Sequence, residues 1–284
     1  MKMILKMFCC DLDNTLMYSW RRPLKGKKQC VEWLDGREIS YMTEAAAEGL
    51  KRLRKKILFV PLTTRTPEQY QRIVFPGGMP ESALVCNGGI LLEKGEIVQD
   101  WHRKSLELIQ DCCGELERGK VILEKDMYRS LDVRWIQGLF LFTKSERPDE
   151  LGERLRETLD LEQVEVFVSR KKIYVIPKVL HKGMALERLR KRLGAETVFA
   201  AGDGELDLPM LAAADFAAAP VELRERMKLG EDVKLRKDVK LGKNVKLREG
   251  MKLGEDMKLR ETAEICWLGG VFSDEMLSWI LHRV

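Results

Sequence analysis

The stretch Cys9-Cys10-Asp11-Leu12-Asp13-Asn14-Thr15-Leu16 decides the fold, because two carboxylates follow directly after a short apolar run at residues 3–8. Such a run, bounded by polar residues, is typical of a buried strand in a parallel sheet. Charged groups at the end of a buried strand are costly unless their charge is compensated, and hard oxygen ligands favour Mg²⁺. The alternative is that Asp11 and Asp13 only start a turn or cap a helix.

Two further apolar runs end in polar residues in the same way. Residues 57–62 lead to Thr63, and residues 198–201 lead to Asp203. Helical patterns separate these runs, and strands that alternate with helices form a doubly wound parallel sheet. Ligands bind at the carboxyl ends of the strands in such sheets. We therefore expect Asp11, Thr63 and Asp203 to lie along one edge.

The pattern changes between residues 90 and 179, where hairpins, helices and β-rich runs predict a separate α+β unit. The sequence therefore predicts an α/β protein with a doubly wound, Rossmann-like parallel sheet and an inserted α+β cap domain. We expect a discontinuous core, residues 1–89 and 180–284, and a cap over residues 90–179.

Local patterns predict further elements within these domains. The Asp35-Gly36 pair predicts the turn of a hairpin over 30–41, and Thr43 can cap a helix over 44–55. Further expected helices lie over 104–118, 148–159, 184–193 and 273–282.

Composition limits the class of protein. Hydrophobic residues make up 45% of the chain and charged residues 33%, as in soluble globular proteins. No apolar run reaches the roughly 20 residues of a membrane helix, and Lys6 interrupts the N-terminal run, so we expect neither a membrane segment nor a secretory signal. Seven cysteines without a C-x-x-C spacing indicate reduced thiols and a cytoplasmic location. The three scattered histidines argue against a histidine metal cage or a Ser/His/Asp triad.

A six-residue repeat occupies residues 227–262. It contains eleven lysines and arginines against seven aspartates and glutamates, and thus most of the net charge of +5. The rest is close to neutral, which argues against a nucleic-acid-binding face. A period of six gives no amphipathic helix, and its Val-Lys-Leu triplets fit short strands. The repeat is either an expanded surface loop without a role or a site for self-association or a protein partner.

Four motifs follow one another along the chain. They are Asp11-Leu12-Asp13-Asn14-Thr15, Leu62-Thr63-Thr64-Arg65, Lys182, and Gly202-Asp203-Gly204-Glu205-Leu206-Asp207. In type and order they resemble the motifs of the haloacid dehalogenase superfamily of phosphohydrolases. Asn87-Gly88-Gly89, followed by an insertion before Lys182, resembles the Cof-like and sucrose-phosphatase-like branch, which carries an α/β cap at this place.

The resemblance implies a role for each motif residue. Asp11 would attack phosphorus and form an aspartyl-phosphate, and Asp13 would protonate the leaving oxygen and later deprotonate water. Magnesium would be held by the Asp11 carboxylate, the Asp13 backbone carbonyl and Asp203. Thr63 and Lys182 would stabilise the transferring phosphoryl group.

The remaining expected site residues surround this centre. Asp207 would orient Lys182 or a metal-bound water. Arg65 and Asn87 either contact substrate or phosphate, or hold the loop and the cap hinge. Leu206 stands where the family usually has Asn, so a group that could hydrogen-bond to the metal ligands is absent. The loss of such a group commonly reduces metal affinity or activity about 10–100-fold.

The sequence thus predicts a cytoplasmic, Mg²⁺-dependent phosphatase for a small phosphorylated metabolite, with a sugar phosphate favoured by the resemblance. One alternative is a phosphomutase, which would return the phosphoryl group from the same aspartate to the substrate. The other is a non-catalytic binding or regulatory protein that docks through residues 227–262, and Leu206 is the residue that favours it.

Overall fold

The computed structural model describes residues 5–24, 26–226, 239–240 and 264–284. The chain divides into two compact units. The first unit comprises Met1–Gly88, Leu92–Glu96 and Lys182–Val284, and the second comprises Gly89–Leu91 and Ile97–His181. The six-residue repeat lies outside the described residues except for residues 239–240, so the predictions for it stay predictions.

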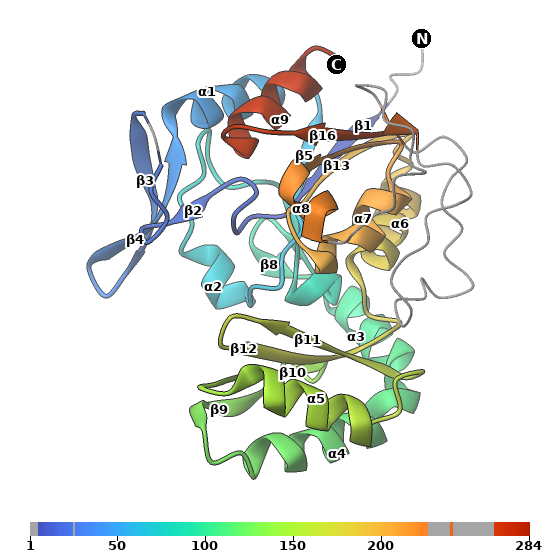
Figure 1. Cartoon of the computed structure of the whole chain (residues 1–284). Coiled ribbons are helices and arrows are strands. Elements are labelled where there is room, and N and C mark those ends of the chain that lie inside the picture. Colours follow the sequence, from blue (N-terminus) through green and yellow to red (C-terminus); the bar gives the residue numbers. More distant parts are fainter. Residues whose placement is uncertain (1–4, 25, 227–238, 241–263) are drawn as a thin grey trace. The chain divides into compact units, whose positions relative to one another are not determined.

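A six-stranded sheet forms the centre of the first unit (Figure 1). Its strands, in spatial order, are β15 (Val239–Lys240), β16 (Glu264–Leu268), β14 (Phe216–Pro220), β13 (Thr197–Ala201), β1 (Lys6–Cys10) and β5 (Leu58–Pro61). Every neighbouring pair is parallel except β15 and β16, which are antiparallel. The predicted α/β fold with a parallel sheet is thus confirmed, and the strand that Asp11 follows lies inside the sheet.

Helices cover both faces of this sheet, which explains why its inner strands are apolar throughout. α1 (Glu44–Leu53) and α9 (Phe272–Leu281) lie on one face, and α6 (Lys182–Leu193) and α7 (Leu208–Ala213) lie on the other (Figure 1). Residues 7–10 of β1 and 198–201 of β13 are buried on both sides of their strands.

A hairpin follows β1 in the chain and belongs to the same unit. Its strands are β3 (Lys28–Leu34) and β4 (Arg37–Thr43), and the short β2 (Tyr18–Ser19) pairs with β4. The turn residues Asp35 and Gly36 both have positive φ, 51° and 74°, as a tight two-residue hairpin turn requires. The predicted hairpin is confirmed, and so is the cap of α1, because the Thr43 hydroxyl accepts from the Ala46 amide at 3.0 Å.

The remaining elements of this part of the chain are short. They are α2 (Pro67–Gln71), β6 (Ser82–Val85), β7 (Ile90–Glu93), β8 (Glu96–Ile97) and α8 (Val221–Arg226). β6, β7 and β8 form a three-stranded sheet in that order. α2 begins with a capping box between Thr66 and Gln69, followed by Pro67 at the first helical position.

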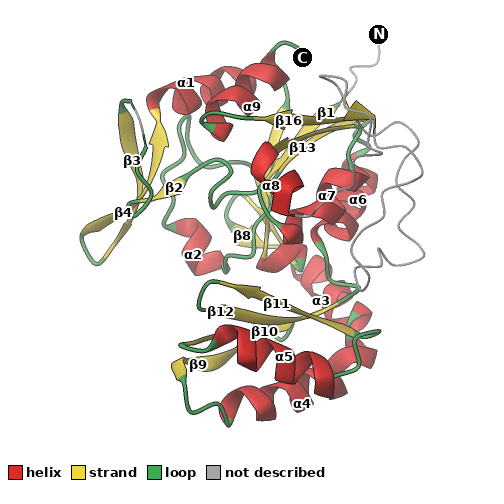
Figure 2. Ribbon diagram, in the orientation of Figure 1, coloured by secondary structure: helices red, strands yellow, loops and turns green. Residues whose placement is uncertain are grey.

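The second unit is built on a four-stranded antiparallel sheet (Figure 2). Its order is β11 (Val164–Ser169), β12 (Lys172–Pro177), β10 (Phe140–Ser145) and β9 (Arg129–Ile136), and its helices are α3 (Gln99–Leu108), α4 (Cys113–Glu124) and α5 (Pro148–Thr158). Gly119 lets α4 approach the sheet, since a Cβ there would lie 3.4 Å from Leu141 and 3.6 Å from Val175.

One predicted helix of this unit is wrong. The expected helix over 104–118 is two helices, α3 and α4, separated by a 3₁₀ turn at Gln110–Cys112. Because of the break, each helix can turn its own apolar side inward. The buried side chains are Trp101 in α3 and Leu116 and Leu123 in α4, and one straight helix would not place all three on the same side.

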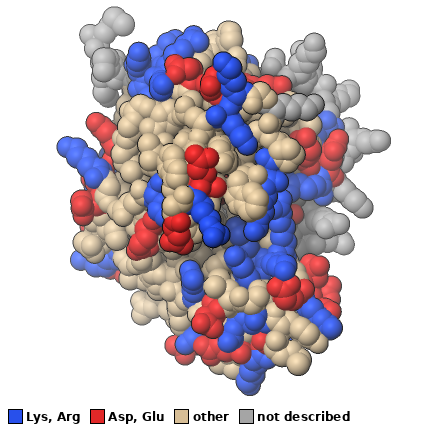
Figure 3. Space-filling model, turned by 90° about the vertical axis from the view of Figure 1, so that its left-hand side faces the viewer, with Lys and Arg blue, Asp and Glu red and all other residues tan. Residues whose placement is uncertain are grey.

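No helix among the described residues has the length and apolar content that a membrane span needs. On the face shown in Figure 3, lysine and arginine side chains are interspersed with aspartate and glutamate. The absence of a nucleic-acid-binding face stays a prediction.

Candidate active site

The carboxyl ends of three adjacent strands meet at one edge of the first unit's sheet. Asp11 follows β1, Asp203 follows β13 and Thr63 follows β5. Backbone hydrogen bonds continue past the strands, because the Asp11 amide donates to the Ala201 carbonyl at 2.9 Å and the Leu62 amide to the Cys10 carbonyl at 2.8 Å. The expected convergence of the three strand ends is therefore present.

Lys182 joins two of the predicted carboxylates. Its Nζ donates to Asp11 Oδ1 and to Asp207 Oδ1, each at 2.6 Å, and the side chain is 2% exposed. Lys182 is the first residue of α6, and Gly183 allows this helix to begin close to α7. A Cβ at Gly183 would lie 2.3 Å from the Pro209 carbonyl oxygen. The close packing of the two helices thus carries the lysine to the strand ends.

Asp207 also shapes the loop that holds Asp203. Its second oxygen, Oδ2, accepts the backbone amides of Asp203 at 3.0 Å and Gly204 at 2.9 Å. Gly202 makes this return possible, since a Cβ there would lie 2.3 Å from the Cβ of Asp207. Both oxygens of Asp207 are therefore engaged by this chain, one by the loop and one by Lys182, and the orienting role of Asp207 stays a prediction.

Thr15 links the two carboxylates that follow β1 and β13. Its hydroxyl lies 3.2 Å from Asp11 Oδ2 and 3.1 Å from Asp203 Oδ1, and it can donate its proton to only one of them at a time. Thr15 is fully buried. It belongs to the quoted motif but was not among the predicted site residues, although its place four residues after Asp11 was visible in the sequence.

The carboxylates in this cluster outnumber the cations. Asp11, Asp203 and Asp207 each place an oxygen within 4.8 Å of the others, and Lys182 is the cation that contacts them among the described residues. Burial raises the pKa of Asp11 well above its usual value, Lys182 offsets part of this rise, and the neighbouring carboxylates add to it. Burial and Asp207 raise the pKa of Asp203 to about 7.

This excess of negative charge fits a divalent cation. Ionised carboxylates that crowd together need a counter-charge, and an all-oxygen donor set is the kind that Mg²⁺ prefers. Asp11 and Asp203 offer the oxygens that the protein does not fully satisfy, whereas Asp207 is already engaged on both oxygens. The residues present therefore fit the expected magnesium ion.

Asp13 lies outside this carboxylate cluster and pairs with Arg65. Arg65 Nε and Nη2 donate to the two oxygens of Asp13, each at 2.8 Å, in a bidentate pair. The Asp13 side chain is half exposed, and Arg65 is 12% exposed. The structure thus separates the two aspartates of the first motif, Asp11 beside Lys182 and Asp13 beside Arg65.

Thr63 and Asn87 meet through the backbone. The Thr63 hydroxyl oxygen accepts the Arg65 amide at 3.2 Å, and the Asn87 amide donates to the Thr63 carbonyl at 2.9 Å. Cys86, Asn87 and Gly88 have successive positive φ values of 52°, 58° and 89°. This left-handed turn therefore supports the loop that carries Thr63, and a substrate contact by Asn87 stays a prediction.

Glu32 on β3 contacts Arg65, and no motif in the sequence pointed to it. Its side chain is completely buried and contacts Arg65 at 2.7 Å and Arg72 at 3.1 Å. No motif contains Glu32, and a glutamate in a hairpin is ordinarily solvated. Only the fold reveals that this carboxylate is inside.

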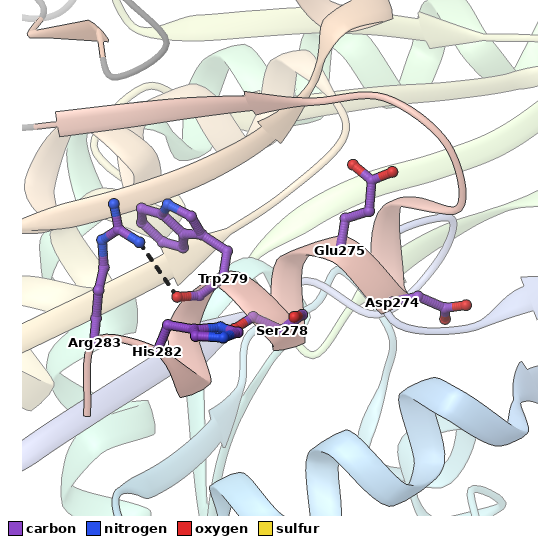
Figure 4. Close-up of a pocket in the computed structure, with 6 residues that line it drawn as sticks. All are labelled: Asp274, Glu275, Ser278, Trp279, His282 and Arg283. Carbon is purple, nitrogen blue, oxygen red and sulfur yellow. Dashed lines mark hydrogen bonds between the residues drawn. The ribbon is translucent and has the colours of Figure 1, made fainter.

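A surface hollow on the first unit lies away from these residues. It measures about 420 Å³ and is lined by α9 and the residues after it: Asp274, Glu275, Ser278, Trp279, His282 and Arg283 (Figure 4). Arg283 donates to the Trp279 carbonyl at 3.4 Å beside it. None of these residues belongs to a predicted motif, so the hollow adds nothing to the site.

The sequence of this chain is similar to those of known hydrolases. A family model described as haloacid dehalogenase-like hydrolase matches residues 118–222. A phosphoglycolate phosphatase from Methanopyrus kandleri is 29% identical over 190 residues, which cover 65% of this chain and 78% of that protein.

Two solved structures share the fold. The sucrose-phosphatase of a Synechocystis species, solved with sucrose and phosphate, has a TM-score of 0.50 and 18% identity, and the match covers 76% of this chain and 83% of that one. A phosphatase of the haloalkanoate (HAD) enzyme superfamily from Bacteroides thetaiotaomicron has a TM-score of 0.51 and 14% identity, and the match covers 98% of this chain and 95% of that one.

Proposed function

We propose that this chain is a phosphoric monoester hydrolase of the haloacid dehalogenase-like family, and that it removes the phosphoryl group from a small phosphorylated metabolite, with Mg²⁺ and through an aspartyl-phosphate on Asp11. One observation carries the proposal. The Asp11 carboxylate lies at the end of the inner strand β1, 2.6 Å from the Lys182 ammonium, within a cluster of three carboxylates.

The first chemical step uses Asp11 and Asp13. An Asp11 oxygen forms a bond to phosphorus while the bond from phosphorus to the ester oxygen breaks, and Asp13 donates a proton to that leaving oxygen. In the second step water attacks the phosphorus of the aspartyl-phosphate. Asp13 accepts the proton of this water, and the Asp11 carboxylate is regenerated with release of inorganic phosphate.

The surrounding residues provide charge and orientation. Asp11, the Asp13 backbone carbonyl and Asp203 would hold Mg²⁺, which supplies positive charge between an anionic nucleophile and an anionic phosphate. Lys182 keeps Asp11 oriented and adds a second positive charge, and Asp207 fixes the position of that lysine. Thr63 offers a hydroxyl at the neighbouring strand end.

The substrate class rests on the kind of relatives that the chain has. The relative from Methanopyrus kandleri is named a phosphoglycolate phosphatase, and the motif resemblance favours sugar phosphates. Both are phosphomonoesters of small hydroxyl compounds with poor leaving groups, so the reaction depends on protonation of the leaving oxygen.

A phosphate-release assay tests the proposal. The purified chain is given p-nitrophenyl phosphate, phosphoglycolate and a panel of sugar phosphates, with Mg²⁺ or with EDTA. We expect release that EDTA abolishes and that Asp11→Asn abolishes, and an acid-quenched reaction should contain protein heavier by one phosphoryl group. The matched control is Asp215→Asn, since Asp215 pairs with Arg190 and bonds the Val198 amide at the start of β13.

Three results would contradict the proposal. These are the absence of release from every substrate, full activity of Asp11→Asn, or an isomeric phosphate as product in place of inorganic phosphate. The last result would establish the phosphomutase alternative.

A further inference from the structure

Glu32 is the most completely buried carboxylate in the described chain, with a relative exposure of 0%. It accepts hydrogen bonds from three side chains: Arg65 at 2.7 and 3.0 Å, Arg72 at 3.1 and 3.2 Å, and the Ser40 hydroxyl at 2.6 Å. Burial would raise the pKa of Glu32, but hydrogen bonds and charge from Arg65, with help from Ser40 and Arg72, lower it below its usual value. Glu32 is therefore a buried carboxylate that stays ionised.

All donors of Arg65 are used within the chain. Nε and Nη2 donate to Asp13, Nη1 and Nη2 donate to Glu32, and Nη1 also donates to the Gln69 carbonyl at 3.4 Å. A guanidinium has five N–H donors in a fixed plane, so this set of five bonds fixes its position and its orientation. In this arrangement Arg65 offers no free donor to a phosphate.

We propose that Glu32 is a positioning residue of the active site, which holds Arg65 in the orientation that grips both oxygens of the general acid Asp13. The proposal rests on the function proposed above and deepens it, because it assigns the β3–β4 hairpin a part in protonating the leaving group.

The hairpin is attached to the loop that it would control. The Val74 amide donates to the Val31 carbonyl at 2.8 Å, and Glu32 forms an isolated antiparallel bridge with Ile73. Arg72 therefore approaches Glu32 from the segment that follows α2. Hydrogen bonds therefore join the hairpin that carries Glu32 to the segment that carries Arg65 and Arg72.

The charges explain why Glu32 is needed. Arg65 alone would hold Asp13 by two bonds, but a long side chain that is gripped at only one side keeps much of its rotational freedom. Glu32 grips the other side of the same guanidinium, so that Asp13, which is half exposed, is held by a rigid partner. A general acid works only within hydrogen-bond reach of the leaving oxygen, and small displacements are costly.

The readout is the dependence of rate on the leaving group. An alkyl phosphate needs a proton on its leaving oxygen, whereas p-nitrophenolate leaves without one. A residue that positions the general acid therefore affects kcat/KM, which reports the first chemical step, for the alkyl phosphate only. A residue with a merely structural role lowers both values together.

The experiment compares Glu32→Gln with wild type on p-nitrophenyl phosphate and on the best alkyl phosphate of the panel, with Mg²⁺. We expect kcat/KM to fall about 10–100-fold for the alkyl phosphate and less than about threefold for p-nitrophenyl phosphate. Asp13→Asn should show the same selectivity with a larger loss. Asp215→Asn, which removes a carboxylate from another, partly buried arginine pair in the same unit, should show no selectivity.

Two further variants test the proposal in case Glu32→Gln does not fold. Ser40→Ala removes one neutral bond to Glu32, and Arg65→Lys keeps the charge but loses the fork, so both should show the same selectivity, smaller for Ser40→Ala. Glu32→Gln added to Arg65→Lys should cause little further loss, because Glu32 acts through Arg65.

The outcomes separate the two proposals. The role of Glu32 is overturned if Glu32→Gln lowers kcat/KM equally on both substrates. It is also overturned if Glu32→Gln, Ser40→Ala and Arg65→Lys cause no loss of kcat/KM while Asp13→Asn remains selective. Both results leave the proposed phosphatase activity intact. Absence of hydrolysis by the wild type, or activity that survives Asp11→Asn, overturns the function itself and this role with it.

Discussion

Each aspartate of the first motif belongs to a different cluster of charged side chains, and the two clusters differ in their net charge. Around Asp11, the carboxylates of Asp203 and Asp207 share Lys182. Around Asp13, the carboxylate of Glu32 is matched by two arginines, Arg65 and Arg72. The first cluster carries more negative than positive charge, and the second is neutral as a whole.

The difference explains what each cluster can do. A cluster with excess negative charge can bind a cation, and the bound cation can attract an anionic substrate. A balanced cluster has satisfied its groups and can only hold its members in place. Asp11 thus belongs to the cluster that can take up a cation and a substrate, whereas Asp13 is held in place by the balanced cluster beside it.

The sharpest test removes the proposed nucleophile from the first cluster. Asp11→Asn should lower phosphate release by at least about 10⁴-fold, because the proposed covalent intermediate forms on the Asp11 carboxylate. In EDTA its free energy of unfolding should not fall, since the change removes one of the clustered carboxylates. A substantial loss of stability measured by denaturant unfolding would show that the cluster is balanced after all.

The next largest effect concerns the cations of the two clusters. Lys182→Met leaves buried carboxylates without their shared ammonium, so the free energy of unfolding in EDTA should fall by about 3–5 kcal/mol. Arg72→Met leaves Glu32 with Arg65 and Ser40, so its loss should be about 1–2 kcal/mol. Urea unfolding of both variants measures the difference, and equal losses would remove the distinction between the clusters.

The pH dependence of the metal-free protein should report the excess charge. The pKa of Asp203 is raised to about 7, so the folded chain holds a proton there that the unfolded chain has already lost above about pH 4. Stability from this group is therefore fully present below about pH 4 and is lost as the pH rises to about 7, by at most about 1.4 kcal/mol per pH unit.

The measurement compares thermal unfolding of wild type and Asp203→Asn between pH 4 and 8. In EDTA the advantage of the wild type should shrink as the pH rises, and Mg²⁺ should stabilise the wild type more at pH 8 than at pH 5, because it competes with protons. A constant difference between the two proteins across this range would contradict the raised pKa.

A change in the support of the helix that carries Lys182 should have a smaller effect than the loss of Lys182 itself. Gly88→Ala places a Cβ 2.2 Å from the Cβ of Ala185 in α6, at a φ of 89°, and should cost about 1–3 kcal/mol. Gly95→Ala is the matched control, since its φ of 86° is similar and no atom lies within 4 Å of its Cβ. Equal costs in urea unfolding would mean that strain alone acts at Gly88.

The elements that could be predicted are those with a local cause. Asp35-Gly36 turned the hairpin and Thr43 capped α1, because each acts through its own few residues. The helix expected over 104–118 was wrong for a non-local reason. Its break at Gln110–Cys112 is set by which side chains the second unit's interior accepts, and periodicity within one segment contains no record of that.

The candidate site shows the same division. The order of strand and motif was enough to expect Asp11, Thr63 and Asp203 at one edge, and four motifs in order indicated the chemistry. The partner of Asp13 could not be foreseen. Arg65 was expected to contact substrate or to hold a loop, and its five bonds to Asp13, Glu32 and Gln69 emerge only when three distant segments meet.

The sequence by itself determined the strands, their apolar faces and the residues that follow them, because those depend on short-range spacing along the chain. The tertiary structure alone decided which carboxylates share a cation and which have one of their own. Burial and charge pairing depend on neighbours far apart in the sequence, and the free energy of an ionised side chain is set by those neighbours.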